Sequence, residues 1–288
     1  MTRRARLMVG AIALFAPVGL TSCSSSAGDD DPAQPPSPSA TPDRPTDDAT
    51  VAEPERPRPT RYEPHAAEVD GAAKRVAARA VEALPAVRQV TYTQYFGYLP
   101  PEASILVEAD FRSGGGTTYD VRLRETAEGW RTASVTPAAD LSPVEEPGRL
   151  ARRVLDSDRI DLPWAGRKDV AAGLVAEPVL RSMLAVAEHH RIGISVLISA
   201  HPVNVFGTDR RSNHPDGQAY DIGSIDGRLV VDPDTAGLVR RVMGIAADTG
   251  AYQVGGPVDP DADGSQYFSD LTHSDHVHVG FDGPAVRP

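Results

Sequence analysis

Apolar residues recur at helical spacing in four stretches of the chain. An apolar side chain every three or four positions predicts an amphipathic helix with one buried face. In the first stretch the apolar set consists of Val69, Ala73, Val76, Ala77, Ala80, Val81 and Leu84. On this basis we expect helices at 66–84, 149–155, 177–191 and 235–247.

Short apolar or alternating runs between turn-forming residues predict β-strands. Four such runs follow the first helix, at 87–96, 105–111, 119–123 and 130–135. A helix followed by a β-meander predicts a small α+β domain at 62–138. This domain contains no cluster of catalytic residue types, and we interpret it as a binding or spacer module whose role is unknown.

The second half of the chain alternates helices with further strands, which we expect at 193–199, 219–222, 229–231 and 276–281. A polar loop at 201–215 separates the first two of these strands. The pattern predicts a second α+β domain at 142–288, with a small antiparallel or mixed sheet flanked by helices.

The N-terminal segment has a different pattern. Arg3, Arg4 and Arg6 precede an apolar stretch at 7–20 that is too short to cross a bilayer, which is typical of a signal peptide at 1–22. The apolar stretch is followed by a cysteine, and residues 20–23, with the sequence Leu-Thr-Ser-Cys23, resemble the lipobox of bacterial lipoproteins. The resemblance implies a Cys23 acylated with palmitate or a similar chain, and an exported protein anchored to the outer face of the cytoplasmic membrane. The alternative is an ordinary signal peptide with an incidental cysteine.

Composition narrows the remaining possibilities. Residues 23–61 are rich in Ser, Pro and Asp and predict a disordered tether. The net charge of −11 argues against binding to nucleic acid. Cys23 is the only cysteine, so no disulfide forms within the chain, and no stretch after residue 22 is apolar enough to span a membrane.

Five of the eight histidines lie between positions 201 and 278, within two short motifs or close to them. His214 lies in the polar loop, and Asp221 lies in the strand seven residues later. Gly217 permits a tight turn between them, so that an imidazole nitrogen and a carboxylate oxygen can meet. The small side chain of Ala219 leaves room for a metal ion near these two atoms.

The second motif is Asp275-His276-Val277-His278 in the last expected strand. Alternation along a strand places His276 and His278 on one face and Val277 on the other. Two imidazoles and one carboxylate are a ligand set of catalytic zinc, which keeps its fourth position for water. We therefore expect one Zn²⁺ ion on His214, Asp221 and His278, with Asp275 or His276 free to handle protons.

Residues 212–221 fit the pattern Ser-x-His-x-x-Gly-x-Ala-x-Asp, and the His-x-His sequence follows about 55 residues later. The two motifs together resemble the D-Ala-D-Ala metallopeptidases and the wider superfamily of zinc peptidases that includes lysostaphin-type enzymes and the hedgehog signalling domain. The resemblance covers roughly residues 178–282. It implies zinc on the three residues named above, Asp275 as the catalytic base, His276 as a stabiliser of the transition state and Ser212 in substrate binding.

One substrate-binding residue of that superfamily has no counterpart here. Many members carry an upstream arginine that helps to hold the substrate, and the corresponding stretch at 199–202 lacks one. Arg210 and Arg211 are the candidates to replace it. The substrate specificity of this chain is therefore not implied by the resemblance.

The resemblance implies a zinc-dependent hydrolase, a D,D-carboxypeptidase or endopeptidase that acts on peptidoglycan stem peptides of the cell wall. A protein tethered to the cell surface would meet that substrate first. One alternative is a non-catalytic, zinc-containing module that binds wall peptides, as the hedgehog domain illustrates. Another is a secreted peptidase for peptides outside the wall.

The remaining polar features have simpler interpretations. Residues 259–270 begin like a calcium-binding loop, but they lack the final Glu and the flanking helices, so an acidic surface turn is preferred to a Ca²⁺ site. His189 and His190 end a helix, where cations suit the helix dipole. We expect His273 to lie in an exposed loop, whereas a site role for His201 is left open.

Overall fold

The computed structural model describes residues 61–262 and 264–286. The predicted signal peptide, the predicted lipidation site Cys23 and nearly all of the predicted tether lie outside these residues. Every helix in the described part of the chain is too short or too polar to cross a membrane.

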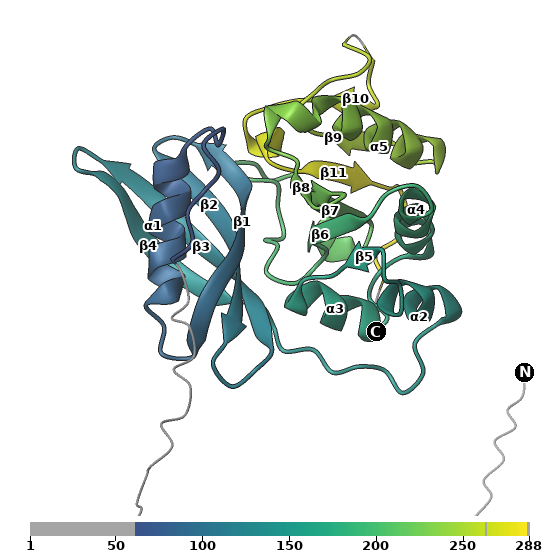
Figure 1. Ribbon diagram of the computed structural model, residues 1–288, viewed down its shortest axis with the longest axis horizontal. Helices are drawn as coiled ribbons and strands as arrows, with labels where there is room; N and C mark the ends of the chain where they lie inside the picture. The colour runs from purple at the N-terminus through teal and green to yellow at the C-terminus, as the bar shows by residue number, and fades with distance from the viewer. Residues whose placement is uncertain (1–60, 263, 287–288) are drawn as a thin grey trace, which may run out of the picture. The chain divides into compact units, whose positions relative to one another are not determined.

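The first sheet is an antiparallel meander of four strands with one helix on its face (Figure 1). The elements are α1 (Gly71–Glu82), β1 (Val87–Leu99), β2 (Glu102–Phe111), β3 (Gly116–Thr126) and β4 (Gly129–Pro137). Asp70 caps α1, because its side chain accepts hydrogen bonds from the N–H groups of Ala72 and Ala73. The small face of α1, with Ala73, Ala77 and Val81, packs on the apolar side of the meander.

The second sheet is mixed and has the strand order β10-β9-β11-β7-β6-β5, with β8 paired to β7. Its strands are β5 (Ile160–Asp161), β6 (Ile192–Val196), β7 (Ala219–Ile225), β8 (Arg228–Leu229), β9 (Gln253–Gly255), β10 (Tyr267–Phe268) and β11 (Val277–Gly280). The helices of this half are α2 (Arg149–Leu155), α3 (Trp164–Ala171), α4 (Glu177–Ala187) and α5 (Ala236–Asp248). Short 3-10 turns occur at His214–Asp216, Pro233–Thr235 and Thr272–Ser274.

The larger core lies between this second sheet and its helices. Met183 of α4 and Met243 of α5 are fully buried, and they belong to the same apolar cluster as Ile222 of β7 and Val277 of β11. The apolar face of β11 therefore points into the core. Its polar residues occupy the alternate positions.

The described part of the chain combines five α-helices with one antiparallel and one mixed sheet, which is compatible with the expected α+β class. The differences from the predicted elements concern their ends and the shortest elements. The first helix begins at Gly71 rather than 66, because the Asp70 cap ends the preceding turn. The helix expected at 177–191 ends at Ala187. The strands β5, β9 and β10 were not expected, since two or three residues are too few to show alternation. Helix α3 was not expected either, and its apolar and polar residues are not well segregated.

The two sheets meet through β1. Phe96 of β1 and Leu106 of β2 form a buried apolar cluster with Val196 of β6. Tyr92 of β1 reaches past Gly223 of β7, and its hydroxyl donates to the main-chain oxygen of Asp275 at 3.2 Å. A Cβ atom on Gly223 would lie only 2.5 Å from the Tyr92 hydroxyl oxygen. The contact between β1 and β7 therefore requires glycine at this position.

We predict that Gly223→Ala destabilises the protein by about 2 kcal/mol, because the added methyl group overpacks the contact with Tyr92. The free energy of unfolding would be measured by urea denaturation. Gly244→Ala in α5 is the matched control: its Cβ would meet no atom within 4 Å, so it should stabilise the helix by roughly 0.5–1 kcal/mol. Equal stability of the two variants would contradict the described packing of β1 on β7.

Candidate metal centre

Neighbouring strands place two of the three predicted ligands side by side. In the antiparallel pairing of β7 with β11, His278 lies directly opposite Asp221. His214 begins the 3-10 turn that leads into β7, and Gly217 ends this turn with a left-handed backbone at φ 72°. A Cβ atom at Gly217 would lie 2.1 Å from the carbonyl oxygen of Leu174. The expected role of Gly217 in returning the loop to the strand thus has both a conformational and a steric basis.

The side chains of these three residues converge on one point. His214 Nε2 lies 3.1 Å from His278 Nδ1 and 3.2 Å from Asp221 Oδ1. The third side of the triangle, from His278 Nδ1 to Asp221 Oδ1, measures 3.0 Å. All three residues are at least nine-tenths buried. The group could therefore hold a metal ion.

Hydrogen bonding leaves lone pairs inside the triangle. The Nδ1 of His214 lies 2.6 Å from the carbonyl oxygen of Leu197, which can only accept, so Nδ1 carries the proton and Nε2 carries a lone pair. Asp221 presents a carboxylate oxygen to the same point. Lone pairs at this separation repel one another unless a proton or a cation lies between them.

The size of the triangle suits zinc. Nitrogen and oxygen ligands lie about 2.0–2.1 Å from a tetrahedral zinc ion, which places the ligand atoms about 3.3 Å from one another. The three sides observed, 3.0 to 3.2 Å, are close to this value. Small movements of the side chains would complete the geometry.

The electrostatics favour the metal-binding protonation states. Burial alone would raise the pKa of Asp221, but the facing rings of His214 and His276 outweigh it and hold the pKa of this carboxyl well below its usual range. Burial lowers the pKa of His278 to about 4. At neutral pH Asp221 is therefore a carboxylate, and His278 is a neutral imidazole that can offer a lone pair to a metal ion at Nδ1.

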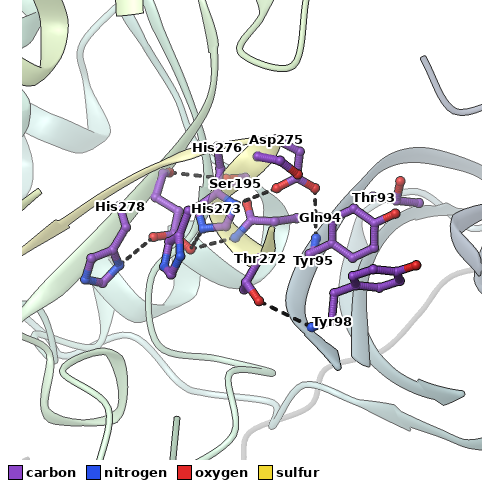
Figure 2. A network of polar contacts seen from close by, with 12 residues as sticks. Thr93, Gln94, Tyr95, Tyr98, Ser195, Thr272, His273, Asp275, His276 and His278 are labelled. Carbon is purple, nitrogen blue, oxygen red and sulfur yellow. Dashed lines mark hydrogen bonds and ion pairs between the residues drawn. The ribbon is translucent and has the colours of Figure 1, made fainter. Parts of the chain in front are cut away.

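The first sheet also contributes to this centre (Figure 2). Gln94 of β1 donates from Nε2 to Asp221 Oδ2 at 2.6 Å, and the residue is 2% exposed. Because the carboxylate can only accept, this contact fixes the orientation of the amide. The Oε1 of Gln94 is buried in the cavity wall and has no hydrogen-bond partner among the described residues. Gln94 thus holds the ligand carboxylate, and its Oε1 remains as a buried acceptor.

A second group of polar residues lies beside the triangle. His276 donates from Nδ1 to Asp275 Oδ1 at 2.6 Å, and its Nε2 lies 3.7 Å from Asp221 Oδ2. The other oxygen of Asp275 accepts from the main-chain N–H of Tyr95 at 2.9 Å and from Lys74 Nζ at 2.5 Å. The Asp275 carboxylate is therefore hydrogen-bonded by His276, by the main chain of Tyr95 and by Lys74, and the side chain of His276 lies between Asp275 and the triangle.

The triangle opens into a cavity of about 490 Å³. Ser212, Arg210 and His276 line it, whereas Asp275 does not. Arg211 lies elsewhere, because its guanidinium pairs with Asp216 at 2.6 Å. The rest of the lining is largely apolar or aromatic and includes Tyr95, Phe96, Tyr98, Leu99, Val205, Phe206, Phe268 and Leu271.

Two histidines that were not assigned to the site also line this cavity. His273 was expected in an exposed loop, but its ring centroid lies 5.0 Å from that of His276, and its Nδ1 lies 2.7 Å from Asp270 Oδ1. His201 stacks on His214 with 4.2 Å between ring centroids. The sequence contained one indication of this position: His273 precedes His276 by only three residues, so that a turn of the chain can bring the two rings together.

The acidic segment at 259–270 is engaged in local contacts. Asp259 Oδ1 accepts from the N–H groups of Asp261 and Ala262, as in an Asx turn, and Asp270 binds His273. Within residues 61–262 and 264–286, no metal-capable group of His, Cys, Asp and Glu other than His214, Asp221 and His278 is found. The acidic turn remains the preferred interpretation of this segment.

The structure brings His214, Asp221, His278 and His276 together with Ser212 and Arg210 around one cavity. Comparison of the chain with protein-family models, with curated proteins and with solved structures finds no match. The peptidase resemblance noted in the sequence therefore stays an expectation, and the function below is proposed from the geometry.

We predict that the protein binds one equivalent of zinc and that Gln94→Ala weakens this binding by roughly 10- to 100-fold, because Asp221 loses the partner that orients it. Isothermal titration calorimetry of the metal-stripped protein would measure the affinity. Gln89→Ala is the matched control, since Gln89 lies on the same strand and makes the same kind of bond, to Asp110 at 2.6 Å. A His214→Ala variant that still binds zinc as tightly as the unmodified protein would exclude the assigned ligands.

Proposed function

We propose that this protein is a zinc-dependent peptidase whose substrates are peptidoglycan stem peptides. The observation that carries the proposal is the triangle of His214, Asp221 and His278, which lies in the wall of a cavity with a histidine at its edge. The ligand set is the one that catalytic zinc sites use, with three protein ligands and a fourth position open to the cavity.

The donor set fits zinc better than the other common cations. Two imidazoles and one carboxylate suit zinc, whereas calcium and magnesium prefer six or more oxygen ligands. When bound, zinc would supply Lewis-acid chemistry, which activates water and polarises a peptide carbonyl. The other requirements of peptide hydrolysis, namely proton transfer and substrate orientation, fall to the residues around it.

His276 is the residue we assign to proton transfer. Its Nδ1–H is held by Asp275 at 2.6 Å, so a neutral His276 presents the Nε2 lone pair toward the cavity. Nε2 can accept the proton that the attacking water loses and can return it to the amine that leaves. In this assignment Asp275 orients the imidazole, instead of serving as the base that the sequence resemblance implies.

The charge on neighbouring groups supports this role. Burial alone would lower the pKa of His276, but Asp221 and Asp275 outweigh it and raise the pKa. The protonated imidazole is therefore stabilised within the site, as a group that must pass a proton to a leaving amine requires.

The cavity suits a short peptide with small apolar side chains. Its aromatic and aliphatic lining provides apolar contacts, and Arg210 is the only lysine or arginine among the described residues that line it. Arg210 can pair with a carboxylate, such as the C-terminus of a stem peptide that ends in D-Ala. The lipid anchor expected at Cys23 would hold the protein at the outer face of the cytoplasmic membrane, next to the cell wall.

A second candidate function is a module that binds wall peptides without cleaving them. One observation favours it: Asp275, at the position where the resembling peptidases carry their acidic base, does not line the cavity. Proton transfer to and from a substrate would then depend on His276 alone. The following two measurements separate the candidates.

We predict that the protein with one equivalent of zinc cleaves purified muropeptides with pentapeptide stems. Mass spectrometry would follow the reaction, because release of D-Ala identifies a carboxypeptidase and new internal amines identify an endopeptidase. A chelator, or His214→Ala, should abolish product formation. Saturable binding of the same muropeptides without any product would contradict the peptidase proposal and favour the binding module.

We also predict that His276→Gln lowers kcat by about 100-fold or more while one equivalent of zinc stays bound, because the variant loses proton transfer but keeps the metal ligands. His190→Gln is the control, since His190 pairs with Asp226 outside the cavity. Full activity of His276→Gln would remove His276 from the mechanism.

A further inference from the structure

Helix α1 carries a lysine in a place where packing alone would select an apolar residue. Lys74 is 0% exposed and lies on the buried face of the helix with Ala73, Ala77, Ala78 and Val81. Lysine is almost never fully buried unless its charge is paired, because removing an ammonium group from water is costly. The charge of Lys74 thus requires an explanation beyond the fold of the first sheet.

All three ammonium hydrogens of Lys74 have acceptors. The Nζ atom lies 2.5 Å from Asp275 Oδ2, 2.6 Å from Glu68 Oε1 and 3.2 Å from the carbonyl oxygen of Thr93. Burial would lower the pKa of Lys74, but Asp275 and Glu68 outweigh it and raise the pKa, so the charge is retained. Lys74 does not line the cavity, and with no donor to spare it cannot bind a substrate anion.

The contact with Asp275 links α1 to the proposed proton-transfer residue. Asp275 is 1% exposed, and its Oδ2 accepts from Lys74 and from the N–H of Tyr95. These two donors, one from α1 and one from β1, leave Oδ1 directed at His276 Nδ1. The ionised carboxylate fixes the imidazole tautomer with the proton on Nδ1, and Nε2 then faces the cavity.

We propose that Lys74 is a positioning residue of the active site, which keeps Asp275 ionised and oriented so that His276 presents Nε2 to the substrate. The unit formed by α1 and β1–β4 is then a structural part of the catalytic site, in place of a spacer or a separate binding module. The kinetic part of this inference rests on the proposed peptidase function, whereas the effect on the His276 tautomer does not.

The test uses Lys74→Met, which keeps the length of the side chain and removes its charge. We expect kcat to fall roughly tenfold or more with KM within about twofold and with zinc still bound stoichiometrically, because outer partners of active-site histidines have effects of this size. Asp275→Asn should show the same loss. Lys168→Met is the control, since Lys168 is exposed and pairs with Asp140.

The double variant Lys74→Met/Asp275→Asn separates positioning from general stability. Removing both charges leaves Glu68 as the remaining ionisable group, and because burial raises the pKa of Glu68 to about 7, this carboxyl can protonate once its partner is lost. The double variant is therefore expected to fold even where Lys74→Met does not. If Lys74 acts through Asp275, kcat of the double variant equals that of Asp275→Asn. If the fold reductions in kcat of the two single variants instead multiply in the double variant, Lys74 acts independently of Asp275 and the proposal is overturned.

A second readout is independent of turnover. The ¹⁵N shifts of the His276 ring in zinc-loaded protein report which nitrogen is protonated. We expect the Nδ1–H form in the unmodified protein and in Lys168→Met, and a mixture of tautomers in Lys74→Met or, where that variant is unfolded, in Asp275→Asn and the double variant. If no muropeptide is cleaved and the tautomer still shifts, the peptidase proposal fails and the positioning role stands. An unchanged Nδ1–H tautomer together with unchanged kcat would refute the positioning role.

Discussion

Two imidazole nitrogens and one carboxylate oxygen face one another at 3.0 to 3.2 Å inside the protein, and this constraint governs the surrounding structure. Such an arrangement is unfavourable unless a proton or a cation lies between the atoms, because the interior offers little solvent to screen the repulsion. The fold nevertheless enforces it. The pairing of β7 with β11 places Asp221 opposite His278, and the left-handed turn at Gly217 returns His214 to them. A metal ion bound there would satisfy all three atoms at once, whereas a single proton can bridge only two of them.

Residues from both halves of the described structure form the candidate metal centre and its surroundings. Strands β7 and β11 and the turn before β7 supply the three candidate ligands. Gln94 of β1 orients one of them, Asp221, while Lys74 of α1 and Tyr95 of β1 orient Asp275 beside the centre. Outer contacts of this kind determine how firmly metal ligands and their neighbouring histidines are held. The close approach of Tyr92 to Gly223 keeps β1 near enough to β7 for these bonds to form.

Local patterns in the sequence were enough to predict the longer helices and strands and to single out the three residues that now converge. Strand alternation correctly placed His276 and His278 on a common face, and the glycine in the loop indicated the turn. The contributions of Lys74 and Gln94 were beyond such reasoning, because they contact residues 201 and 127 positions away. One local signal was present: Lys74 interrupts an otherwise apolar helix face, at spacings of four and seven from Ala78 and Val81. The positions of His273 and Arg211 depended on loop conformation, which has no periodicity to interpret.

The central claim is that one metal ion binds to His214, Asp221 and His278. Diffraction data collected above and below the zinc absorption edge, from crystals of zinc-loaded protein, would test it most directly. We predict a single strong anomalous peak about 2.0–2.2 Å from His214 Nε2, Asp221 Oδ1 and His278 Nδ1. A peak on other residues, or the three side chains turned away from one another with no peak between them, would contradict the account.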